Sequence, residues 1–209
     1  MLHIYAFSTP NSIKVPIALE ETGLEYRLHA VNTKAGDQRT DAFKALNPNA
    51  KVPVLVDDST GTAPFVLTES AAILVHLAER SGRLLPSDPT ARARVFEQLF
   101  FHASALSPAF GQSGYFQKLA PEKLPAAIAR FGDEARRVMR VLDDVLADRT
   151  YVAGEAYSIA DIAHFGWLWR RAFPGIELEE TPHVKRWYDA MAERPAVIKA
   201  IAAVEGLVP

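Results

Sequence analysis

The chain has 209 residues, of which 49% are hydrophobic and 23% are charged, and its formal net charge is -2. This composition is typical of a globular protein of one or two domains, and it gives no electrostatic reason to expect nucleic acid or an anionic membrane as a partner. No apolar run approaches the roughly 20 residues that cross a bilayer, and the start MLHIYAF lacks a cationic leader, so we expect a cytoplasmic protein.

The first part of the chain alternates short strands with helices. The turn Ser8-Thr9-Pro10-Asn11-Ser12 opens a helix that Gly23 ends. A loop with a short helix then precedes the stretch 47–70, which reads as a strand, a turn and a second strand, followed by a helix to about residue 82. This order predicts a small α/β domain over residues 1–82, with strands at 2–7, 25–31 and 52–56.

The stretch 47–70, NPNAKVPVLVDDSTGTAPFVLTES, carries two features that indicate a bound peptide-like ligand. Val52-Pro53 is an X-Pro step at the head of a strand, where we expect a cis bond that turns the backbone of Val52 outward to pair with a peptide. Glu69 and Ser70 stand before an apolar helix, whose N-terminus attracts a carboxylate, and the carboxylate of Glu69 fits an ammonium group. We therefore expect an amino-acid head group to bind here.

The pattern changes at residues 83–88, in GRLLPSDP, which we interpret as a linker. From 89 to 209 the sequence predicts an all-helical domain, because apolar residues recur every three or four positions along two long segments. We expect Gly111 and Gly114 to break the first of these helices. Ser158 and Asp161 have the spacing of a capping box, so we interpret Asp161 as structural.

These residues, in this order, resemble the glutathione site of the soluble glutathione transferase family, and the resemblance covers nearly the whole chain. It implies an N-terminal thioredoxin-like βαβαββα domain at 1–82 and, after the linker, a helical domain at 89–209 that forms the second-substrate pocket. It also implies glutathione as co-substrate, a role in detoxification and a homodimer. The six histidines show no metal-ligand spacing, so we expect no metal.

The turn TPN before a helix, and GQSGYF followed by AP, resemble the bacterial nu class of this family and its disulfide-bond reductases. In that class, the residues matching Thr9 and Asn11 line the thiol site, and Ser8 is a second candidate donor by likeness to serine-type transferases. The alternative is that Asn11 or Ser12 only caps the helix. The downstream motifs favour the thiol site, because this turn should lie at the same end of the sheet.

Three further contacts follow from the resemblance. Gln38 matches a glutamine that holds the glycyl end of the ligand. Lys51 could pair with the glycyl carboxylate, although a solvated lysine is the common alternative. Arg130 matches an arginine that reaches the ligand, in one interpretation across a dimer interface, but it could equally be one of several charges on a solvent face. The segment 111–116 either walls the second-substrate pocket or is a plain interhelical turn.

The chain contains no cysteine, so no side chain can form a mixed disulfide. The thiol must belong to the ligand, and its pKa, about 8.5 or above, must be lowered by a hydrogen-bond donor or a helix N-terminus. We therefore expect glutathione to reduce small disulfides, to be conjugated to electrophiles, or both. The alternative function is that of a non-catalytic binding or regulatory protein, since relatives in this branch include regulators.

Overall fold

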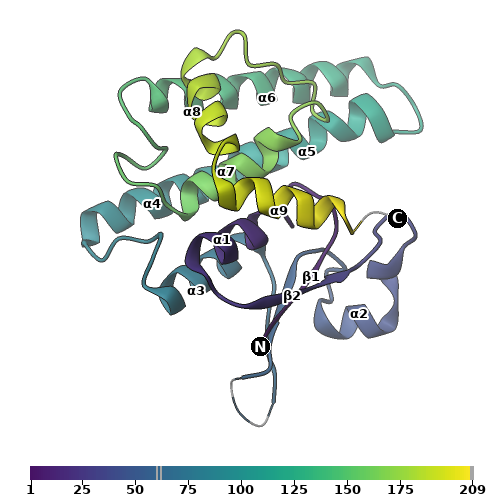
Figure 1. Cartoon of the computed structure of the whole chain (residues 1–209). Coiled ribbons are helices and arrows are strands. Elements are labelled where there is room, and N and C mark those ends of the chain that lie inside the picture. Colours follow the sequence, from purple (N-terminus) through teal and green to yellow (C-terminus); the bar gives the residue numbers. More distant parts are fainter. Residues whose placement is uncertain (60, 62, 208–209) are drawn as a thin grey trace. The chain divides into compact units, whose positions relative to one another are not determined.

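The computed structural model describes residues 1–59, 61 and 63–207. The chain falls into two compact units, Met1–Leu84 together with Arg194–Pro209, and Leu85–Glu193. Figure 1 shows the first as a small sheet with helices and the second as helical. The fold class predicted from the sequence, a thioredoxin-like domain followed by an all-helical domain, is confirmed.

The sheet of the first unit has four strands in the order β2-β1-β3-β4. β1 and β2 are parallel, whereas β3 runs antiparallel to both of its neighbours, β1 and β4. The residues that pair across the middle of the sheet are buried and apolar, with Ile4 of β1 facing Leu55 of β3. The strands are β1 (Leu2–Ala6), β2 (Tyr26–Ala30), β3 (Val54–Asp57) and β4 (Phe65–Leu67).

Helices connect these strands and pack on one another. The crossover between the parallel pair runs through α1 (Lys14–Thr22), which packs against α3 (Ser70–Ser81), and η1 (Asp37–Arg39) and α2 (Asp41–Leu46) lie between β2 and β3. α1 and α3 each end at a left-handed glycine, Gly23 with φ +74° and Gly82 with φ +67°. Glycine is favoured at these helix ends because a Cβ is strained at positive φ.

The last helix, α9 (Pro195–Glu205), belongs to the first unit, where it packs against α1. Two ion pairs join them, Arg194 with Glu21 and Lys199 with Glu20, each at 2.7 Å. The sequence assigned all of 89–209 to a helical domain. The division differs because chain order does not reveal which unit a terminal helix packs on.

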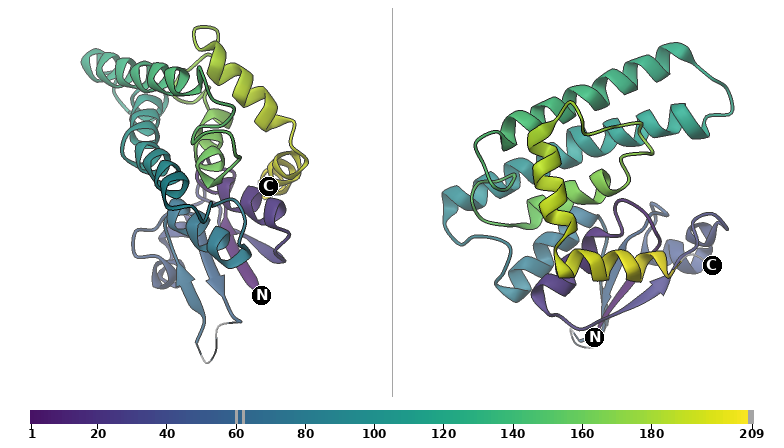
Figure 2. Two further views of the ribbon diagram at one scale, coloured as in Figure 1. Left: turned by 90° about the vertical axis from the view of Figure 1, so that its left-hand side faces the viewer. Right: turned by 45° about the horizontal axis from the view of Figure 1, so that its top comes forward.

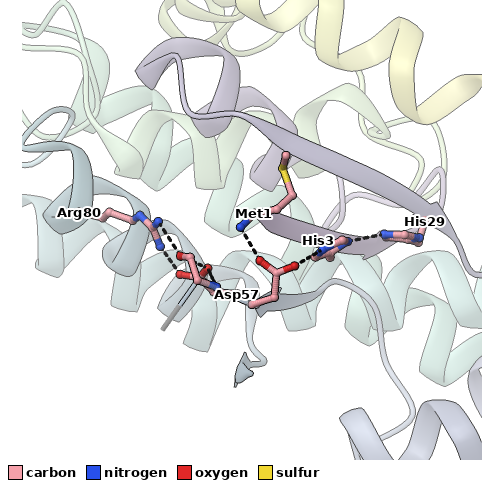
Figure 3. Close-up of polar contacts among 7 residues, drawn as sticks. Met1, His3, His29, Asp57 and Arg80 are labelled. Atoms are coloured by element: carbon pink, nitrogen blue, oxygen red, sulfur yellow. Dashed lines mark hydrogen bonds and ion pairs between the residues drawn. The ribbon is translucent and has the colours of Figure 1, made fainter. Parts of the chain in front are cut away.

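Polar contacts cluster at one end of the sheet (Figure 3). Arg80 near the end of α3 reaches the buried carboxylate of Asp57, the last residue of β3. On β1, His3 Nε2 lies 3.1 Å from Asp58 Oδ2, and its Nδ1 lies 2.9 Å from Nε2 of His29 on β2. These contacts connect β1, β2, β3 and α3 at the end of the sheet where β1 begins.

The second unit contains one long helical segment that is followed by three more helices. α6 runs beside α5, as Figures 1 and 2 show. The elements are α4 (Pro89–Phe101), η2 (His102–Leu106), α5 (Ser107–Gly114), η3 (Tyr115–Leu119), α6 (Pro125–Leu146), α7 (Ile159–Trp169) and α8 (Pro182–Ala192). In the described part of the chain, no helix combines the length and the apolar character that crossing a membrane would take.

The expected break at Gly111 and Gly114 was wrong. Both glycines lie inside α5, and helical geometry continues without interruption from Pro89 to Leu119 through two π-helical turns. Gly114 has a packing role instead, because a Cβ at this position would lie 2.2 Å from the ring of Phe173. The segment 111–116 is therefore neither an interhelical turn nor a loop.

The capping box predicted at the start of α7 is confirmed. Ser158 Oγ accepts from Ala160 N at 3.3 Å, and Asp161 Oδ2 accepts from Ser158 N at 2.9 Å. Asp161 Oδ1 also accepts from Val152 N at 2.9 Å and from Trp187 Nε1 at 3.0 Å. Burial raises the pKa of the Asp161 carboxyl to about 6, although these hydrogen bonds lower it. Asp161 thus holds three segments together.

Candidate functional site

A pocket of about 210 Å³ in the first unit gathers most of the residues singled out in the sequence. It is lined from the turn before α1, from the loop between α2 and β3, and from the start of α3. Its lining consists of Asn11, Asn47, Asn49, Lys51, Val52, Pro53, Glu69 and Ser70. Segments far apart in the chain therefore meet at a single polar hollow.

The Val52-Pro53 peptide bond is cis, as the sequence predicted. Pro53 is buried, and the side chain of Val52 packs against the cluster of Val31, Phe43 and Val54. Because its side chain is anchored on this core, Val52 contributes to the pocket from a fixed position.

Asn47 fixes the loop that leads to this bond, a role that the sequence analysis did not assign. It is 4% exposed, its Nδ2 donates to Lys51 O at 2.8 Å, and its Oδ1 accepts from Asn49 N at 3.0 Å. Such contacts of a short amide side chain with its own loop replace backbone turn bonds. The Asn-Pro-Asn sequence was the signal for this turn.

Glu69 adopts an unusual backbone conformation, with φ +66° and ψ 112°, as the N-cap residue of α3. Positive φ is strained for a residue with a Cβ, and such residues concentrate at functional sites. Neither the side chain of Glu69 nor another side chain caps this helix. The first turn of α3, beginning at Ser70, therefore faces the pocket with the partial positive charge of a helix N-terminus.

Of the three candidate thiol donors, Asn11 lines this pocket. Thr9 is engaged within its own turn, because its Oγ1 donates to Ser12 Oγ at 2.9 Å and accepts from Ser12 N at 3.1 Å. The side chain of Ser12 is fully buried there. Ser8 is half-buried in the same turn and does not line the pocket.

Lys14, the first residue of α1, is a residue of this site that the sequence analysis missed. It is 1% exposed, and its Nζ donates to Asn11 Oδ1 at 2.8 Å and to Ser70 Oγ at 3.3 Å. Burial lowers the pKa of the Lys14 ammonium to about 7, although the nearby carboxylate of Glu69 raises it. The available signal was a lysine in the otherwise apolar start of a helix, KVPIAL.

The remaining predicted contacts are more scattered. Lys51 lines the pocket with an exposed side chain. Gln38 lies in η1, where its Nε2 donates to Thr33 O at 3.3 Å and its Oε1 is buried without a partner in the described part of the chain. Arg130 lies in α6 of the second unit, 72% exposed and 3.9 Å from Glu134.

The segment 111–116 packs inside the second unit. The ring of Phe116 stacks on Phe131 of α6 with ring centroids 5.2 Å apart, and Ser113 Oγ donates to Pro174 O at 2.9 Å. Within residues 1–59, 61 and 63–207, no group of three or more metal-ligating side chains comes together.

Comparison with known proteins agrees with the fold. Residues 9–80 match the model of the glutathione S-transferase N-terminal domain, and residues 100–195 match the model of its C-terminal domain. The chain thus belongs to the glutathione S-transferase family.

Several relatives within this family are similar over most of their length. The disulfide-bond oxidoreductase YfcG of Escherichia coli strain K12 is 38% identical to this chain. The match covers 96% of this chain and 94% of that protein. A glutathione transferase family member from Pseudomonas fluorescens was solved with two glutathione bound. It is 38% identical to this chain with a TM-score of 0.89, and the match covers 96% of this chain and 92% of the other.

A glutathione transferase from Pseudomonas putida was solved with one glutathione disulfide per subunit. It is 37% identical with a TM-score of 0.90, and the match covers 96% of this chain and 90% of the other.

Proposed function

We propose that the chain binds glutathione in the pocket between Asn11, Val52 and Glu69. In this arrangement, Glu69 holds the ammonium of the γ-glutamyl end, while Ser70 and the start of α3 hold its carboxylate. The backbone of Val52 pairs with the cysteinyl residue, and Asn11 donates to its sulfur. The observation that carries the proposal is that these four residues, from three separate segments, line one pocket.

The glycyl end is the less closely defined part of the site. Lys51, exposed at the rim, is suited to a carboxylate. Gln38 is the second candidate for this end, because its buried Oε1 has no partner in the described residues. Thr9 and Ser8 act through the shape of the turn that presents Asn11. Arg130 stays a candidate contact from a second subunit.

The reaction that we propose is the reduction of small disulfides by glutathione, with conjugation to electrophiles as a second activity. A glutathione thiolate attacks one sulfur of the disulfide and releases a thiol, and a second glutathione then cleaves the mixed disulfide to give glutathione disulfide and the other thiol. Because the chain has no cysteine, both attacking sulfurs come from glutathione. The oxidoreductase relative and the neighbour with two glutathiones support this route.

We further propose a cytoplasmic homodimer with a detoxifying role. The cytoplasm maintains reduced glutathione, which the proposed reaction consumes. Phe100 on α4 is 68% exposed and stacks on Phe96 with ring centroids 6.2 Å apart, and aromatic rings are enriched at protein interfaces. Sedimentation equilibrium of the full chain tests the dimer.

Retention on immobilised glutathione, followed by turnover on 2-hydroxyethyl disulfide and on 1-chloro-2,4-dinitrobenzene, tests the proposed function. Retention with turnover of the disulfide supports the reductase, and retention with turnover of the electrophile alone supports conjugation. Retention without either activity supports the alternative, a non-catalytic binding or regulatory protein. Failure to bind glutathione contradicts all three.

Asn11→Ala then tests the assignment of the thiol donor. We expect turnover to fall about 100-fold because the thiolate loses a hydrogen-bond donor, while affinity for glutathione stays largely intact because the γ-glutamyl contacts remain. Steady-state kinetics with varied glutathione separate kcat from KM. Unchanged kcat would remove Asn11 from the proposed mechanism.

A further inference from the structure

Lys14 occupies a position that the proposed contacts with glutathione do not explain. Long charged side chains are almost never fully buried without a reason, yet Lys14 is 1% exposed at the start of α1. Its ammonium reaches Asn11 before α1 and Ser70 at the start of α3. It therefore bridges two residues that line the pocket, one before α1 and one at the start of α3.

The chemistry of an ammonium group decides how these two neighbours face the ligand. An ammonium carries three N–H donors and no acceptor, so both partners must accept from it. With Oδ1 of Asn11 held by Lys14, the amide presents its NH₂ donors elsewhere. With the oxygen of Ser70 accepting from Lys14, its O–H remains able to donate. Both residues line the pocket and are left as donors, an arrangement suited to anions.

The charged groups that the structure places near Lys14 include Glu69 and Lys51. Glu69 is the carboxylate that acts on it, and it raises the pKa that burial lowers to about 7. Lys51 lines the same pocket but is exposed to water. The other charged residues on helices packed against α1 are engaged farther away, since Glu20 and Glu21 pair with α9 about 9 Å or more along the helix.

At the opposite end of α3, Arg80 pairs with Asp57, and His76 and Glu79 also lie in the second half of that helix. An anion that binds in the pocket would add a negative charge near Lys14. It would favour the protonated ammonium over the neutral amine.

We propose that Lys14 is a positioning residue that turns Asn11 and Ser70 toward the thiolate and the γ-glutamyl carboxylate of glutathione, and that it takes up a proton as this anion binds. This inference rests on the proposed glutathione site. For glutathione itself, the thiol releases one proton as the thiolate forms, and Lys14 takes up one as its amine becomes an ammonium. For S-methylglutathione, which has no thiol, only the uptake remains.

Proton uptake can be measured by isothermal titration calorimetry at pH 7.5 to 8 in buffers of different ionisation enthalpy. We expect the wild-type protein to take up as much as one proton with S-methylglutathione and close to none with glutathione. In Lys14→Met, whose side chain is of similar length and uncharged, uptake with S-methylglutathione should vanish, and glutathione should release as much as one proton. Affinity for both ligands should fall at least about tenfold.

Lys51→Met is the matched control, because it removes a lysine of the same pocket that is exposed to water. We expect it to keep the wild-type proton uptake with S-methylglutathione, even if affinity falls. Equal uptake in Lys14→Met and in the wild-type protein overturns the inference. If the wild-type protein binds S-methylglutathione without proton uptake, the role of Lys14 is wrong while the proposed glutathione site stands. If it binds neither ligand, the proposed function fails as well.

A second measurement on the wild-type protein does not depend on the folding of a variant. With ¹³C-labelled lysine, the ε-carbon signal of Lys14 should titrate near pH 7 in the free protein. S-methylglutathione should shift that titration upward by about one pH unit or more. A midpoint that does not change with the ligand overturns the inference even if Lys14→Met is unfolded.

Discussion

Ser70 shows how a single hydroxyl can serve a ligand instead of its own helix. It is the first residue of α3, it is half-buried at the pocket, and it accepts from the ammonium of Lys14 at 3.3 Å. The helix itself is left without a side-chain cap. A carboxylate at this point would receive both the hydroxyl hydrogen and the first N–H groups of the helix.

Ser70→Ala should weaken glutathione binding about tenfold, because a hydrogen bond to a charged group contributes about 1.5 kcal/mol. The matched control is Ser81→Ala in the last turn of the same helix, where the hydroxyl donates to Leu77 O at 2.8 Å. This control should bind glutathione as the wild-type protein does. Calorimetric titration of both variants is the measurement, and equal losses of affinity would point to a general weakening of α3.

Much of the pocket could be predicted at this scale, since Val52-Pro53 and Glu69-Ser70 are local motifs whose chemistry is visible in the sequence. Lys14 could not, because a lysine at the start of a helix usually reaches water. Only its packing against Asn11 and the start of α3 reveals a buried amine. The hydrogen bonds of Thr9 with Ser12 were also hidden, because hydroxyl contacts within a turn look the same in a sequence as donors to a ligand.

Elements were predictable where their ends carry a signal of their own. Gly23 and Gly82 end α1 and α3 as expected, and the capping box starts α7 at Ser158. The long helical segment through Gly114 was not predicted, because glycine disfavours helices on average. Here tertiary packing accounts for the glycine inside the helix, since the ring of Phe173 fills the space that a side chain at position 114 would need.

The contact between Arg80 and Asp57 joins two elements and leads to a prediction about stability. Burial raises the pKa of the Asp57 carboxyl, but hydrogen bonds from Ser59 and Arg80 and the charge of Arg80 outweigh it and hold the pKa at about 2. Arg80→Met removes one partner of a buried carboxylate. We expect the free energy of unfolding at pH 7 to fall by about 1 to 3 kcal/mol.

This loss should depend on pH in a defined direction. With its lowered pKa in the folded state, ionised Asp57 stabilises the wild-type protein above its ordinary pKa of 3.8, and this contribution is lost as the pH falls toward about 2. The difference between the two proteins should therefore shrink from pH 4 to pH 2. Urea unfolding followed by circular dichroism measures it. Arg94→Met, which breaks an exposed pair with Glu97 on α4, should cost less than about 0.5 kcal/mol.

At the scale of the whole molecule, two properties of the chain define its chemistry. Every residue that lines the candidate pocket comes from the first 70 positions, all within the first unit. The chain as a whole contains no cysteine, so a thiol-disulfide reaction can run only through sulfur that the ligand brings. The assignment of α9 to the first unit was the large-scale feature that the sequence did not reveal, because helical periodicity identifies a buried face without naming its partner.

Resistance to thiol alkylation follows from the lack of cysteine. Protein that has been treated with N-ethylmaleimide, freed of reagent and then supplied with glutathione should reduce 2-hydroxyethyl disulfide at the untreated rate, because the reagent finds no thiol on the chain. Ser8→Cys provides the matched control, since it adds a thiol to the turn that precedes Asn11 and should make turnover sensitive to the same treatment. If the wild-type protein loses activity on alkylation while its glutathione affinity is unchanged, a side chain that the reagent modifies is needed for turnover, and glutathione sulfur alone does not account for the reaction.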